Sequence, residues 1–145
     1  LVDYGRSVRD VKPLETAYNK WADIDKTVII LNGGTTNKTI ERLGSLNKHF
    51  NNLDSNGIPV VAFYEPDLGD QMSAFCFLVD ERVFNRTLYP DFVPETLPWS
   101  KKKPTEKQLS ELEVKNKKNY EHWVEKVGGE NNAFLRDFLK PLRTA

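Results

Sequence analysis

The chain has 145 residues, of which 39% are hydrophobic and 29% charged, and its 21 basic and 21 acidic side chains cancel. This composition is ordinary for a folded soluble protein with one hydrophobic core. No apolar run approaches the roughly 18 residues that a membrane span needs, so no membrane association is expected, and the single cysteine, Cys76, excludes an internal disulfide and fits a cytoplasmic protein.

The first half of the chain alternates predicted helices and strands. Apolar residues at spacings of three and four predict a helix over Asp10–Ile24. The β-forming run Thr27–Leu31 predicts a strand buried on both faces. A helix over Thr36–Asn52 and a strand at Pro59–Tyr64 would complete a right-handed crossover. The apolar run Ser73–Val79 follows too closely for a second crossover, so we expect it to pair antiparallel with Pro59–Tyr64 or to lie in a neighbouring position.

The second half is expected to be helical after an irregular segment. Residues 81–89 have no clear preference, and three prolines make Pro90–Pro98 an extended strap, with expected anchors at Phe92, Leu97 and Trp99. Thr105 and Gln108 have the spacing of a capping box, which predicts a helix to Val127 that ends before two glycines. A last helix is expected over Ala133–Leu139.

These elements predict an α/β fold with a three-layer mixed sheet of three to four strands, flanking helices and a C-terminal helical extension. We expect an α/β domain over residues 1–98 and a helical extension over residues 99–145 packed on it. Residues 1–99 carry 10 basic and 14 acidic side chains, whereas residues 100–145 carry 11 basic and 7 acidic ones. The positive extension indicates an acidic partner, or only a solvated helical face.

An acidic loop between two apolar runs is the first candidate site. Glu65, Asp67 and Asp70 fall within six residues, and like charges so close repel one another. Their oxygens could bind a divalent cation or orient a water molecule for proton transfer. The alternative is a tight hairpin turn, set by Pro66 and Gly69, whose acids simply face solvent.

A lysine-rich segment is the second candidate site. Lys101, Lys102, Lys103 and Lys107 could contact phosphates, together with further lysines at positions 115, 117 and 118. Trp99 and Tyr120 could stack on bases or sugars. The alternative is a set of solvated lysines beside core aromatic residues.

The order of elements resembles the archaeal and eukaryotic type of peptidyl-tRNA hydrolases, particularly their divergent bacterial and phage-like relatives. Phe63-Tyr64-Glu65-Pro66-Asp67 resembles the end of a strand and its acidic loop in that family, and Ser73-Ala74-Phe75-Cys76-Phe77 resembles the strand that follows. The resemblance covers about residues 10–80.

The resemblance implies hydrolysis of the ester that joins a peptide to tRNA, with no metal or other cofactor. It implies catalytic roles for Glu65 and Asp67, and tRNA phosphates would meet Lys101, Lys102, Lys103 and Lys107. The first strand of the family, with its lysine and glutamine–histidine helix start, has no counterpart in the sequence, and we expect it to precede Leu1.

Two other functions remain open from the residues. The first is a non-catalytic interaction module whose C-terminal helices bind a protein, because aromatic side chains dominate such interfaces. Its contacts would be Trp99, Trp123, Phe134 and Phe138. The second is a metal-dependent phosphatase or nuclease that uses the three acids of the loop.

Overall fold

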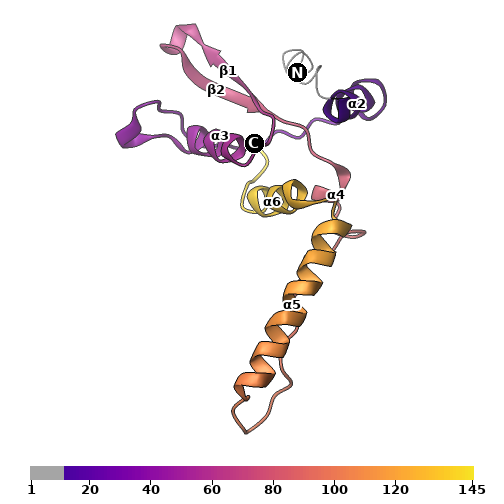
Figure 1. The fold of residues 1–145 in the computed structure, drawn as a ribbon. Helices are drawn as coiled ribbons and strands as arrows, with labels where there is room; N and C mark the ends of the chain where they lie inside the picture. Colours follow the sequence, from indigo (N-terminus) through magenta and orange to yellow (C-terminus); the bar gives the residue numbers. More distant parts are fainter. Residues whose placement is uncertain (1–11) are drawn as a thin grey trace. The chain divides into compact units, whose positions relative to one another are not determined.

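The computed structural model describes residues 12–145, apart from the side chains at positions 12–14 and 40. It divides into two compact units, whose helices and strands are labelled in Figure 1. The hairpin unit contains the described residues up to Leu78 together with Leu139–Ala145, and the helical unit is Val79–Phe138. The domain boundary predicted after residue 98 stays a prediction. Among the helices of residues 12–145, none has the length and apolar character needed to cross a membrane.

The hairpin unit opens with a helix, as predicted. The α-helix α2 (Lys12–Lys20) continues into a π-helical turn, η1 (Trp21–Asp25), while residues 10 and 11 of the predicted helix lie outside the described residues. The turn ends at Lys26, whose left-handed backbone (φ 49°) directs its N–H to the carbonyl oxygen of Trp21. The Trp21 indole donates to the carbonyl of Thr27 at 2.7 Å, which fixes the exit of the chain.

The strand predicted at Thr27–Leu31 is absent from the described structure, so that prediction is wrong. Val28, Ile29 and Ile30 are 58%, 54% and 70% exposed. A single bridge joins Leu31 to Thr144, supported by hydrogen bonds between residues 30–32 and 143–145. Because a strand needs a neighbouring ladder, the apolar run alone does not form one.

The helix predicted over Thr36–Asn52 begins late. A 3-10 turn, η2 (Ile40–Arg42), precedes α3 (Ser45–Ser55). The side-chain oxygen of the buried Asn47 accepts the Asn37 N–H at 2.8 Å and the Thr36 hydroxyl at 3.3 Å. These side-chain bonds hold the preceding segment in a loop, where polar side chains compete successfully with a helical backbone.

A two-stranded sheet follows α3. Strands β1 (Val61–Glu65) and β2 (Gln71–Cys76) pair antiparallel, with a register irregularity between Phe63 and Tyr64. The predicted antiparallel pairing is confirmed. The predicted three-layer sheet of three to four strands and its crossover are wrong for the described residues, where β1 and β2 pair only with each other. Leu53, Ile58 and Met72 are buried in this unit, and Phe50 of α3 meets Phe75 of β2 edge to face.

The helical unit confirms the predicted C-terminal helices. It contains α4 (Glu81–Phe84), α5 (Glu106–Lys126) and α6 (Glu130–Leu139). The capping box at the start of α5 forms as predicted: the Gln108 N–H reaches the Thr105 hydroxyl at 3.2 Å, and the Thr105 N–H reaches the Gln108 side chain at 3.0 Å. Val124, Val127 and Ala133 form a small apolar core where α5 meets α6.

A buried arginine ties this unit together. Arg136 is 1% exposed, and it donates to the carbonyl oxygens of Arg82 and Tyr89 at 2.7 Å each and to the Asp91 carboxylate at 2.8 Å. Its guanidinium carbon lies 5.6 Å from the centre of the Trp123 ring, a favourable cation–π distance. The α6 helix therefore organises the turn that follows α4.

A second arginine pair stabilises the start of α4. Asp80 caps the helix by accepting the Arg82 N–H at 2.8 Å, and its carboxylate also pairs with the Arg82 guanidinium. The hydrogen bonds that the Arg82 guanidinium donates to the Asp80 carboxylate raise the pKa of Arg82 above its ordinary value, although burial acts in the opposite direction.

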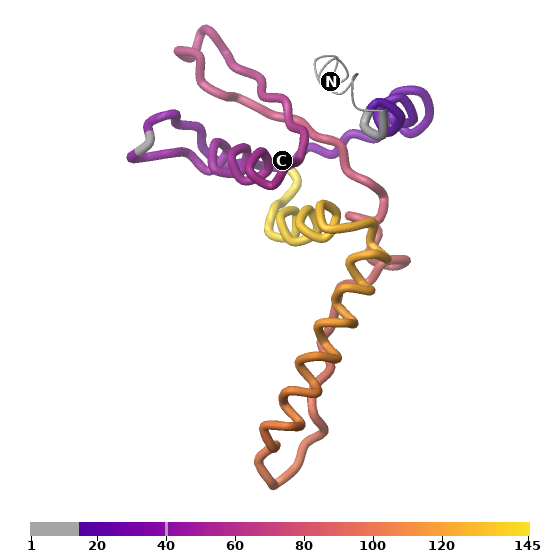
Figure 2. Tube along the Cα trace, in the orientation of Figure 1, coloured from indigo at the N-terminus to yellow at the C-terminus, as the bar shows by residue number. Residues whose placement is uncertain are grey.

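Residues 90–98, which contain no helix or strand, form a strap along α5, as Figure 2 shows. The Asn116 side chain accepts the Glu95 N–H at 2.8 Å and donates to the Glu95 carbonyl at 2.9 Å. Nearby, Phe92 packs edge to face on Tyr120 at 5.3 Å between ring centres. The predicted extended strap is therefore present, held along α5 by an amide clamp and an aromatic anchor.

Candidate functional site

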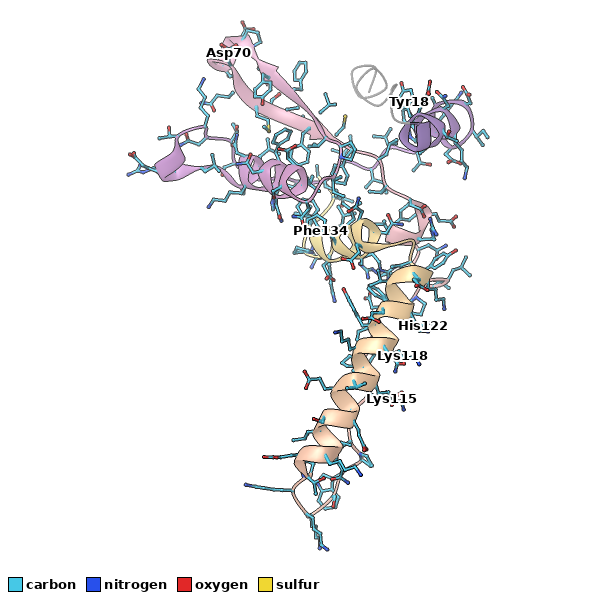
Figure 3. The ribbon with its side chains drawn as sticks, viewed as in Figure 1. Tyr18, Asp70, Lys115, Lys118, His122 and Phe134 are labelled. Atoms are coloured by element: carbon cyan, nitrogen blue, oxygen red, sulfur yellow. The ribbon has the colours of Figure 1, made fainter. Side chains whose placement is uncertain are left out.

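The acidic loop lies at the closed end of the β1–β2 hairpin, where Figure 3 labels Asp70. A 3-10 turn, η3 (Pro66–Leu68), leads to Gly69 and Asp70, which both have positive φ angles, and the Asp70 N–H returns to the Glu65 carbonyl at 3.0 Å. Glu65 is half-buried, whereas Asp67 and Asp70 are exposed. The loop is a tight turn that presents its acids mainly to water.

The chemistry of this turn is limited by what surrounds it. The Lys38 ammonium group donates a hydrogen bond to the Gly69 carbonyl at 2.8 Å and so places a positive charge beside the acids. Within residues 12–145 no group of three or more histidine, cysteine, aspartate or glutamate side chains is arranged to hold a metal ion. Geometry therefore gives no support to a metal-dependent phosphatase or nuclease built on the loop.

Two open hollows lie elsewhere, on the surface of α5. One is lined by Ser110, Val114 and Lys118 with their neighbours, and the other lies beside Tyr120 and Val124 at the α6 end. Both are shallow, and neither includes the acidic turn. Glu65 and Asp67 thus stand outside both hollows, and their catalytic role stays a prediction.

The lysine-rich segment forms the tip between the strap and α5. We define the basic tip as Trp99 to Lys103. Its tryptophan is 86% exposed, and Lys101, Lys102 and Lys103 are all exposed. Trp99 was expected to anchor the strap, which is wrong: Phe92 and Leu97 are half-buried, but the Trp99 ring stands in solvent.

The remaining lysines are less uniformly available. Lys107, in the first turn of α5, lies 3.9 Å from the Glu111 carboxylate, a weak exposed pair. Lys115 makes a closer contact, 2.6 Å, with Glu95 of the strap. Lys118, labelled with Lys115 in Figure 3, lines the first hollow of α5. The basic tip differs from these positions in that three exposed lysines follow one another in the chain.

The aromatic residues proposed for a protein interface differ greatly in exposure. Trp123 is half-buried, because its indole donates to the Pro90 carbonyl at 2.9 Å and its ring faces Arg136. Phe134 and Phe138 are also half-buried and stack on each other at 5.9 Å. Of the four, Trp99 is the one that offers most of its surface to a partner.

The sequence reasoning overlooked Arg136 and Asn116. Arg136 had one available signal in the sequence: it lies three residues after Ala133, hence on the same face of the predicted helix, and the structure buries both residues. Asn116 had none, because its partner, Glu95, lies 21 residues earlier in an irregular segment. Both residues are structural: Arg136 holds the turn after α4, and Asn116 holds the strap at Glu95.

Comparison with known proteins adds no relative: no family model, no curated protein and no solved structure matches this chain. The site is therefore interpreted from its own residues.

Proposed function

We propose that this chain binds tRNA as a peptidyl-tRNA hydrolase-like protein, with the basic tip as its RNA contact. The observation that carries the proposal is an 86% exposed tryptophan followed within four residues by three exposed lysines. RNA-binding surfaces combine these two groups, because ammonium groups neutralise phosphates and aromatic rings stack on bases.

The local charge favours an anionic partner. Between Trp99 and Ser110, four lysines stand against one acid, Glu106. A surface of this kind attracts a polyanion over about 8–10 Å at physiological salt. Protein interfaces, by contrast, tend to be depleted of lysine, so the lysines favour RNA over a protein partner at this tip.

The hydrolytic part of the proposal depends on the acidic turn. Glu65 is the half-buried acid of the turn, and a carboxylate within hydrogen-bond reach of a bound substrate can transfer a proton in the reaction. The test is turnover of a peptidyl-tRNA by the chain and by its Glu65→Gln and Asp67→Asn variants. Slower turnover in a variant supports a catalytic role for that residue, and an equal rate removes the residue from the mechanism.

The binding part has its own test. Replacement of Lys101, Lys102 and Lys103 by glutamine should weaken tRNA binding and reduce the slope of log K against log salt by about 2, since each single-strand phosphate contact contributes about 0.7. The matched control replaces three exposed lysines of the hairpin unit: Lys20, Lys48 and Lys140. An equal loss in both triple variants would show that only total charge matters and would refute the assignment to the tip.

A protein partner is the second candidate, supported by a different surface. Phe63, Tyr64 and Leu68 of the hairpin are 60%, 52% and 57% exposed. Apolar side chains that gather on one exposed element indicate an interaction surface. The test is the molar mass measured by light scattering at several protein concentrations. A mass that rises with concentration in the parent but not in a Phe63→Ser, Leu68→Ser double variant would support self-association through this surface. A constant monomer mass in the parent would oppose it.

A further inference from the structure

The strap holds the basic tip at a defined place on the helical unit. On one side, the Asn116 amide binds both main-chain groups of Glu95, and Lys115 contacts the Glu95 carboxylate at 2.6 Å. On the other side, Thr105 caps α5 directly after Pro104. The tip is therefore tethered at both ends by contacts within the same unit.

Within this tip, the Trp99 ring has no internal role. It is 86% exposed, and no other aromatic ring of the described residues stacks on it. Large exposed apolar groups cost free energy in water. The preceding Pro98 restricts the backbone next to it. An indole with open faces, next to a restricted residue, is arranged to receive a flat ligand.

We infer that Trp99 is a stacking platform for an unpaired nucleotide, while the following lysines contact the adjoining phosphates. This inference rests on the proposed tRNA binding and specifies which part of an RNA the tip receives. Two residues of chain span at most about 7 Å, so Lys101 is close enough to reach the phosphate next to a base that stacks on Trp99.

Duplex RNA fits this tip less well. Its bases are already stacked on one another, and its deep major groove does not admit side chains, so proteins recognise it by shape and by backbone contacts. A base in a single strand or at an unpaired end offers both faces to an aromatic ring. The tip supplies one exposed ring and a row of ammonium groups, which suits a single strand.

A membrane surface is the main competing ligand, because tryptophan and lysine also occur together at lipid interfaces. Stable attachment of that kind needs a larger apolar area, as on an amphipathic helix with several apolar side chains. Here the apolar residue closest before Trp99 is the half-buried Leu97, and the residues after it are serine and lysines. One ring is enough for a base but offers little area to a bilayer.

The experiment measures affinity for three RNA probes of equal length: a single strand, its abasic counterpart and a duplex. We expect the whole chain to bind the single strand about 5- to 150-fold more tightly than the abasic strand, the range given by stacking of one base on an aromatic ring. Trp99→Ala should remove this preference without changing the salt slope, and Trp99→Phe should keep most of it.

Val114→Ala serves as the control, because it removes another exposed apolar side chain, 69% exposed, from the middle of α5. It should leave all three affinities unchanged. Far-UV circular dichroism verifies that each variant is folded, which is expected because neither side chain is buried.

Failure of the inference can be told apart from failure of the proposed function. Equal binding of the single strand and the abasic strand, with the salt slope intact, would overturn the stacking role and leave RNA binding in place. No salt-dependent binding of any probe would overturn both. Binding to vesicles that contain phosphatidylserine, lost in Trp99→Ala and accompanied by no preference for bases, would assign the tip to membranes and overturn the inference.

Discussion

Replacement of the buried Arg136 by methionine should strongly destabilise the helical unit. Methionine retains much of the aliphatic stem but removes the guanidinium, and with it three hydrogen bonds of 2.7–2.8 Å. The Arg82 and Tyr89 carbonyls would then lose their Arg136 donor. The Asp91 carboxylate is less affected, because it is 45% exposed and also pairs with Arg86.

The magnitude follows from these contacts. A carbonyl left without a donor in a buried site costs about 1–3 kcal/mol. At about 1.5 kcal/mol each, the two carbonyls together cost about 3 kcal/mol. Loss of the cation–π contact with Trp123 adds about 1 kcal/mol. The expected total is about 4 kcal/mol, a large share of the roughly 5–15 kcal/mol that stabilises a typical domain.

The assay is urea unfolding followed by circular dichroism, which reports the helices, and by tryptophan fluorescence, which includes Trp123. Arg136→Lys should lower the free energy of unfolding by about half as much as Arg136→Met. One ammonium group cannot reproduce the planar set of donors that the Arg136 guanidinium directs at separate acceptors. The control is Arg42→Met at an exposed position of η2. A loss below about 1 kcal/mol in Arg136→Met would refute the view that this arginine organises the unit.

Three further changes test local features of the fold. Thr105→Ala removes the capping-box hydroxyl and should cost about 1 kcal/mol in urea unfolding, whereas Thr105→Ser should be nearly neutral. Gly44→Ala places a methyl group against the Thr35 carbonyl oxygen, and because that neighbour is backbone we expect a loss of about 1–3 kcal/mol. A thermal midpoint equal to that of the parent would contradict the close approach. Asn47→Leu leaves the Asn37 N–H without its acceptor and should cost about 1–3 kcal/mol, measured as faster hydrogen exchange in the loop before α3, and unchanged exchange would count against the bond.

The elements that were predicted correctly depend on residues close together in the chain. The capping box of α5 needs only Thr105 and Gln108, and the glycines at positions 128 and 129 end that helix directly. The β1–β2 hairpin follows from two apolar runs that a short turn must bring together. In each case the interacting groups are separated by few residues, so their spacing in the sequence was enough.

The errors arose where the outcome depends on distant partners. Thr27–Leu31 has the composition of a buried strand, but a strand also requires a neighbour, and within residues 12–145 its backbone pairing is a single bridge to Thr144. The late start of α3 depends on Asn47, whose side chain holds Asn37 ten residues earlier. Hydrophobic periodicity carries no information on either event.

The candidate sites divide in the same way. Two features of these sites could be predicted: the acidic turn closes a hairpin, and the lysines are accessible. Both follow because charged residues in short connections face solvent. The exposure of Trp99 could not be predicted, because a tryptophan that lies next to an apolar segment usually packs against that segment. In the strap, Phe92 packs on Tyr120 of α5, and Trp99 is the aromatic residue that faces solvent.

The contacts of Arg136 also affect how the chain matures during translation. Arg136 is synthesised 54 residues after Arg82 and 47 residues after Tyr89. The carbonyls of Arg82 and Tyr89 therefore lack this hydrogen-bond donor until the ribosome has added the intervening segment. At about 5–20 residues per second, this interval lasts several seconds. Nascent chains halted before residue 136 should accordingly remain sensitive to protease between α4 and α5, and become resistant once α6 has left the exit tunnel.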